Sequence, residues 1–184
     1  KYFSTHPDWV RDAIKYAADH DVLIVNAAGN ESLNLDEKMV YPNDQTPDNA
    51  IEISDNFLTV GALNYDYGSK LVADFSNYGK KNVDVFAPGN KIWSTTPNNE
   101  YEYLQGTSMA SPEVAGIAAM IRSYFPKLTA PQVKKIIMDS GLPVQANVIV
   151  GGDRLNTQEF SELSTSGKIV NLYNALILAS KVSK

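Results

Sequence analysis

The chain has 184 residues, no cysteine and a formal net charge of −5, and 43% of its residues are hydrophobic. This length and composition suffice to bury the core of one globular domain, whereas the lack of cysteine excludes disulfides and zinc–thiolate sites. The modest negative charge without a basic patch argues against nucleic-acid binding, and no apolar stretch approaches the ~20 residues that span a membrane, so we expect neither partner.

The first predicted elements are a helix over 7–20 and a strand over 22–25. The strand is apolar and β-branched and leads through small residues to Asn30, which is typical of a buried parallel strand with a site at its carboxyl end. An ordinary turn asparagine is the alternative for Asn30. His6 and His20 fall at the two ends of the helix, where we interpret them as surface residues without a catalytic role.

A long loop over 32–57 separates this strand from the next one, and it is rich in acidic side chains. A solvated acidic loop is the simplest interpretation. The acidic residues of the loop are Asp36, Glu37, Asp44, Asp48, Glu52 and Asp55. Further strands are predicted at 58–63, near 83–87 and at 92–95. Buried strands that alternate with helices predict an α/β fold, a parallel sheet covered by helices on both faces.

The segment 106–116 reads Gly-Thr-Ser-Met-Ala-Ser-Pro-Glu-Val-Ala-Gly and places Ser108 at the start of a helix of small residues. Gly106 permits a sharp turn, and Pro112 fits a first helical turn. The free N–H groups of such a helix end would stabilise an anion that forms beside the serine, which suits acyl transfer. The small residues predict a buried helix, so a serine cap on a core helix is the alternative.

Two more helices are predicted after the serine helix. Thr129 and Gln132 have the spacing of a capping box, and Gly141 marks the end of that helix. A segment over 144–166, rich in Gly, Asn, Ser and Thr, separates it from the last helix. We interpret this segment as a surface insertion.

The string 106–116 resembles the serine motif of the subtilisin-like serine proteases nearly letter for letter, and the block ending Ala27-Ala28-Gly29-Asn30 resembles their oxyanion segment. Glu113 departs from the motif, since many members carry histidine there. The resemblance implies a subtilisin-like parallel sheet. It implies Ser108 as nucleophile, and Asn30 with the Ser108 N–H as the oxyanion hole.

The resemblance also implies a substrate site formed by Ala28, Gly29, Val40, Gly106 and Thr107, with a protein or peptide as substrate. Val40 precedes Tyr41-Pro42, which follows the floor of the primary specificity pocket in relatives, and many relatives carry glycine at its position. A floor valine predicts a preference for small or medium side chains before the scissile bond.

No cofactor or metal is expected, apart from a weak structural cation near Asp84 that resembles one in some relatives. A solvated aspartate at a strand end is the simpler interpretation of Asp84. The resemblance further implies secretion or a place at the cell envelope.

The catalytic aspartate and histidine of the family lie in an Asp-x-Gly block and a His-Gly-Thr-His-Val-Ala-Gly block, and neither block occurs here. We therefore expect residues 1–184 to be the C-terminal portion of the domain, truncated at its N-terminal part. The missing part would supply both residues, and the isolated chain would be inactive because a serine without a base is a poor nucleophile. Its exposed sheet edge predicts self-association. A non-catalytic, protease-like scaffold is the alternative.

Overall fold

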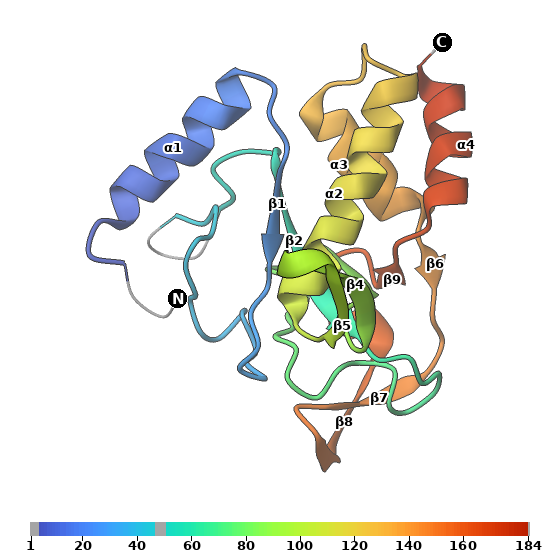
Figure 1. Ribbon diagram of the computed structural model, residues 1–184. Helices are drawn as coiled ribbons and strands as arrows, with labels where there is room; N and C mark the ends of the chain where they lie inside the picture. The colour runs from blue at the N-terminus through green and yellow to red at the C-terminus, as the bar shows by residue number, and fades with distance from the viewer. Residues whose placement is uncertain (1–3, 47–50, 184) are drawn as a thin grey trace.

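The computed structural model describes residues 4–46 and 51–183 (Figure 1). Its centre is a five-stranded sheet in the order β1-β2-β3-β9-β6. Four strands are parallel and β6 runs antiparallel to β9. The bounds are β1 (Ile24–Ala27), β2 (Phe57–Leu63), β3 (Val85–Pro88), β6 (Leu142–Pro143) and β9 (Lys168–Ile169). The mainly parallel α/β fold predicted from the sequence is confirmed.

Helices flank this sheet, and the predicted helices all form. They are α1 (Pro7–Asp19), α2 (Thr107–Tyr124), α3 (Ala130–Ser140) and α4 (Leu172–Val182). The capping box of α3 is confirmed, since the Thr129 side chain accepts from the Gln132 N–H and the Gln132 side chain accepts from the Thr129 N–H at 2.8 Å. Helices α2, α3 and α4 stand together over the sheet (Figure 1).

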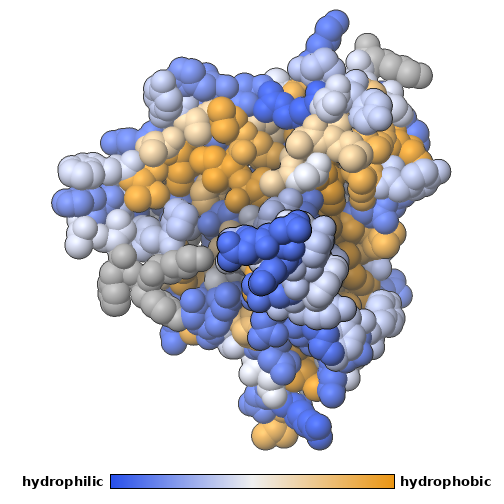
Figure 2. Space-filling model, viewed as in Figure 1, coloured by the Kyte–Doolittle hydropathy of each residue, from blue (hydrophilic) through white to orange (hydrophobic). Residues whose placement is uncertain are grey.

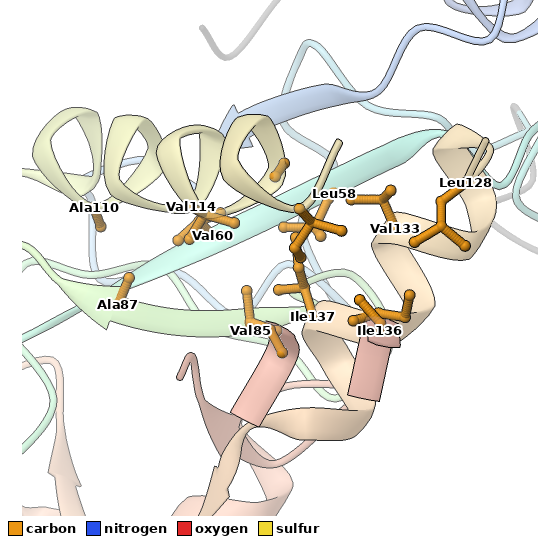
Figure 3. Close-up of a cluster of buried hydrophobic side chains, with 14 of the residues drawn as sticks. Leu58, Val60, Val85, Ala87, Ala110, Val114, Leu128, Val133, Ile136 and Ile137 are labelled. Atoms are coloured by element: carbon orange, nitrogen blue, oxygen red, sulfur yellow. The ribbon is translucent and has the colours of Figure 1, made fainter. Parts of the chain in front are cut away.

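The main core lies between this helical layer and the sheet. Val60 and Val85 point from β2 and β3 toward Val114 of α2, and all three side chains are fully buried (Figure 3). Ile137 extends the same cluster onto α3. Burial of such side chains contributes about 1.5–3 kcal/mol each, so this layer holds the start of α2 firmly against the carboxyl ends of the strands.

Loops and a hairpin cover the opposite face of the sheet. The hairpin consists of β7 (Asn147–Val150) and β8 (Asp153–Glu159), which is followed by a 3₁₀ turn over Phe160–Glu162. Val148, Val150 and Phe160 are fully buried, and the Phe160 ring lies 5.3 Å from that of Phe86. The interpretation of 144–166 as a surface insertion is therefore wrong for its base, whose apolar side chains complete a second core.

A second hairpin lies in front of the start of α2 (Figure 1). It consists of β4 (Ile92–Thr96) and β5 (Glu100–Leu104), which are joined by a turn at Pro97–Asn99.

No helix in the described ranges is long and apolar enough to cross a membrane.

Helix α2 is buried along one face only, which corrects the prediction of a buried helix. Ala110, Val114, Ala118 and Ile121 form the buried face. Ala115, Gly116, Ala119 and Met120 are exposed on the other face, and a Cβ added at Gly116 would meet no atom within 4 Å. The small residues of this second face therefore make no close contact with another described element of the chain, and the face is open.

The open face of α2 lies beside the edge of the sheet. Among the described strands β1 pairs only with β2, and the residues of β1 are half-buried. Figure 2 shows hydrophobic side chains gathered over α1, β1 and the adjoining part of α2. An unpaired strand next to an exposed apolar helix face marks a surface that lacks a covering partner.

Candidate active site

Ser108 is the second residue of α2, and its side chain is exposed. The helix can start there because Gly106 has a φ of 143°, a backbone conformation that favours glycine. A Cβ at Gly106 would lie 3.2 Å from Asn30 Nδ2 and 3.6 Å from the Ser108 backbone nitrogen. The missing side chain thus leaves a small space onto which two nitrogen donors converge.

The sequence predicts Pro112 in the first turn of its helix, whereas the structure places it one turn further along α2. The helix begins at Thr107, so the absent N–H of Pro112 is the one that would have bonded the carbonyl of Ser108. The prediction is wrong because the turn at Gly106 starts the helix closer to the serine. Pro112 therefore leaves the carbonyl of Ser108 without the N–H donor that a regular helix would provide.

Asn30 follows β1 and is held by the start of α2. Its Oδ1 accepts two hydrogen bonds from Thr107, one from the backbone N–H at 2.9 Å and one from the hydroxyl at 2.8 Å. The Thr107 hydroxyl in turn accepts from the Gly29 N–H at 3.0 Å. With Oδ1 occupied in this way, the amide Nδ2 faces the space beside Gly106.

Two donors at this space are free to act on a ligand. Within residues 4–46 and 51–183, neither Asn30 Nδ2 nor the Ser108 backbone N–H has a hydrogen-bond acceptor. Donors that are fixed before a reaction and aimed at one point stabilise an oxyanion that develops there. The arrangement has the chemistry of an oxyanion hole next to an exposed serine hydroxyl.

The remaining predicted substrate residues lie in two different settings. Ala28 and Val40 line the same small hollow, together with Tyr41 and Asp44. Gly29 has a φ of 111° at the turn that leads to Asn30. Thr107 is fully buried, so its side chain offers no surface to a substrate and serves to position Asn30. A hydroxyl next to the serine, at a helix start, was the only signal for this role in the sequence.

Asp84 is buried and paired, which corrects its interpretation as a solvated aspartate. Its side chain is 5% exposed, and its Oδ2 accepts from the Thr59 N–H at 2.6 Å. Lys134 Nζ lies 3.4 Å from Asp84 Oδ1 and 3.5 Å from Glu52 Oε2. Burial raises the pKa of Asp84, which Lys134 opposes. Burial lowers the pKa of Lys134, but Asp84 and Glu52 raise it above its ordinary value overall.

Asp44 shows that the acidic loop is only partly solvated. Its side chain is buried, and desolvation together with the negative charge of Glu52 raises its pKa to about 7. Glu37, Glu52 and Asp55 are exposed, and Asp48 lies outside the described residues. In the described ranges no group of three or more Asp, Glu or His side chains is arranged to hold a metal ion.

The histidines lie at the ends of α1, as predicted. His6 precedes the helix and stacks on Trp9, and His20 follows it with Nδ1 2.8 Å from the Tyr16 carbonyl oxygen. Both side chains are exposed. Neither lines the groove next to Ser108, which is formed by the β4–β5 hairpin and the start of α2, including Glu113. Burial raises the pKa of the Glu113 carboxyl.

Residues 1–167 match the model of the subtilase family. The chain belongs to the subtilase family. Subtilisin DY of Bacillus licheniformis is 33% identical over 150 residues, which are 81% of this chain and half of that protein. The major intracellular serine protease of Bacillus subtilis is 37% identical over 117 residues, 62% of this chain and 33% of the relative.

Solved subtilase structures agree with this assignment. The patellamide maturation protease PatA is similar with a TM-score of 0.67 at 28% identity, over 94% of this chain and 57% of that structure. This chain therefore spans only part of these relatives, from 33% to 57% of their lengths. The family includes both intracellular and cell wall-associated proteases, so membership is compatible with either compartment.

Proposed function

We propose that this chain is the nucleophile-bearing part of a serine endopeptidase domain that hydrolyses peptide bonds through an acyl-enzyme on Ser108. The observation that carries the proposal is the pair of free donors, Asn30 Nδ2 and the Ser108 N–H, that converge beside the serine hydroxyl. In such a reaction the hydroxyl attacks the scissile carbonyl, and the carbonyl oxygen gains a negative charge that the two donors stabilise.

We propose further that the general base and its orienting carboxylate come from polypeptide outside these 184 residues. The sequence holds two histidines, and both are occupied at the ends of α1. The open face of α2 and the free edge of β1 offer a docking surface for such a segment. It would bring a histidine to Ser108 and cover the apolar surface seen in Figure 2.

The proposed substrate is a protein or peptide, because the space around Ser108 is an open groove. Ala28 and Val40 would contact the side chain before the scissile bond, and Val40 would restrict its size. Gly106 would allow the substrate backbone to approach closely, whereas the space at Gly29 is filled by Asn77 and Glu31, so Gly29 would only shape the turn before Asn30. The sequence suggests a weak cation near Asp84. In our proposal the ammonium group of Lys134 takes its place, because it lies against that carboxylate.

Peptidase assays on the complete domain test this proposal. We expect turnover of unstructured protein substrates by the domain that includes the upstream segment, and its loss in Ser108→Ala. Ser123→Ala is the matched control, because Ser123 is exposed further along the same helix. A folded complete domain that cleaves no unstructured substrate would favour a non-catalytic scaffold instead.

A further inference from the structure

The hairpin β7–β8 is anchored to the domain at its base and extends toward the loop that follows Asn30. Its base is anchored by Val148 and Val150, which are fully buried. On one side, the Ile149 N–H donates to the Ser69 carbonyl at 2.7 Å. The hairpin is therefore fixed to the body of the domain and its tip has a defined position.

The tip of the hairpin lies against the loops that carry the site. Gly151 and Gly152 form the turn with φ values of 64° and 70°. Ideal Cβ positions on these glycines would lie 3.4 Å from Ser32 and 3.4 Å from Asp74, respectively. Ser32 comes two residues after Asn30 and is bonded to Asp74, since its hydroxyl donates to the Asp74 carbonyl at 2.7 Å. The tip thus touches the segment that follows the oxyanion asparagine.

A groove of about 560 Å³ runs between this tip and the residues that precede Ser108. Its lining includes Gln105, three positions before the serine, together with Phe75 and Asn90. Arg154 of the hairpin also lines it. The groove therefore extends from the segment just before Ser108 to the hairpin β7–β8.

The charge of this groove differs from that of the whole chain. Lys70, Lys91 and Arg154 line it, against Asp66 and Asp74, whereas the chain has a net charge of −5. No ion pair within 4.0 Å joins these cations to either aspartate in the described part of the chain. Lys91 is engaged by the hydroxyl and the ring of Tyr65, so Lys70 and Arg154 are the cations left for a ligand.

We infer that this groove binds the part of the substrate that follows the scissile bond, and that Arg154 with Lys70 selects substrates with an acidic side chain there. The inference rests on the proposed function. The hollow of Ala28 and Val40 and the groove share no lining residue. Ala28 leads into Asn30, and Gln105 in the groove leads into Ser108. In this proposal, a peptide whose preceding side chain enters the hollow passes Ser108 and continues past Gln105 toward the hairpin.

The test uses the complete protease domain and peptides that are identical up to the scissile bond. After it they carry Asp, Asn or Lys at the second, third or fourth position. We expect kcat/KM to be highest for an Asp peptide, by about fivefold over its Asn analogue, which is the scale of an exposed ion pair. The preference should shrink with added salt, because exposed charges are screened.

Variants then assign the selection to the hairpin. Arg154→Gln and, separately, Lys70→Gln should each reduce the ratio of Asp to Asn peptide cleavage, and Arg154→Glu should favour the Lys peptide. Lys127→Gln, at an exposed turn after α2, is the control and should leave the ratio unchanged. An Asp to Asn ratio near one in the active wild-type domain, or a ratio that Arg154→Glu does not alter, would overturn the inference. Absence of all cleavage would instead refute the proposed function.

Discussion

Thr107 donates two hydrogen bonds to the side-chain oxygen of Asn30, although 77 positions separate the two residues in the chain. One threonine thereby orients the amide that faces the space beside Ser108. Asn30 is itself exposed, so without these bonds its amide would rotate freely. The proposed oxyanion site therefore depends on both the end of β1 and the start of α2.

Loss of the Asn30 amide should reduce turnover without preventing substrate binding. We expect Asn30→Ala in the complete domain to lower kcat by about 10²–10³-fold with little change in KM, the cost established for one oxyanion donor in a subtilisin. Steady-state kinetics on one peptide substrate measure both constants. A rise in KM at unchanged kcat would contradict the assignment.

Thr107 provides a finer test of the same site. Thr107→Val keeps the volume and the backbone N–H but removes the hydroxyl, so kcat should fall by about 5- to 10-fold, as expected for one neutral hydrogen bond. Thr107→Ser restores a hydroxyl and should recover most of the loss. Unchanged kcat in Thr107→Val together with a loss in Thr107→Ser would show that packing of the methyl group, and not the bond to Asn30, is what matters.

Lys134 should be essential for stability. Lys134→Met leaves Asp84 buried without its counter-charge, so we expect the free energy of unfolding to fall by about 3–5 kcal/mol. Lys135→Met is the matched control, since Lys135 is exposed and pairs with Asp139 only at the surface. Denaturant unfolding should give a clearly lower free energy of unfolding for Lys134→Met than for Lys135→Met. Similar values for the two variants would exclude a structural role for the pair of Lys134 and Asp84.

Asp44 predicts a specific dependence of stability on pH. Its pKa is raised from 3.8 to about 7, so the folded protein binds this proton more tightly than the unfolded chain. The stabilisation by this group is therefore full below about pH 4 and is lost as the pH rises to about 7, by at most about 4 kcal/mol. Asp44→Asn should flatten the curve of unfolding free energy over this range. An unchanged curve would contradict the raised pKa.

Val40 should set the width of the hollow that it lines with Ala28, which we propose to hold the side chain before the scissile bond. Val40→Gly removes two methyl groups from its lining, so the complete domain should accept larger side chains before the scissile bond. Peptide libraries that vary only this position measure the change, and positions after the bond serve as the internal control. An unaltered preference would place Val40 outside the substrate site.

The sequence predicted the elements well where local patterns decide them. The β-branched run before Asn30, the Thr129–Gln132 capping box and the helix at Ser108 all form as expected. The hydrogen bonds of Thr107 to Asn30 could not be predicted from spacing, because they depend on how two distant segments meet. The pairing of Asp84 could not be predicted for the same reason, since Lys134 lies on another element.

The hairpin β7–β8 shows a different limit of sequence reasoning. Its polar and glycine-rich composition is typical of a surface loop, and the tip is indeed exposed. Val148 and Val150 lie two residues apart on one face of a short strand, but the apolar Ile149 between them hides the alternation that marks a half-buried strand. Only the fold reveals that these side chains complete the core and that Arg154 lines one groove with Gln105.

Active-site labelling tests most directly whether Ser108 is a nucleophile whose base lies outside this chain. A fluorophosphonate probe should label the complete domain stoichiometrically at Ser108, as located by mass spectrometry, and should label the isolated 184-residue chain very slowly or not at all. Rapid labelling of Ser108 in the isolated chain, or no labelling of a folded complete domain, would contradict this account.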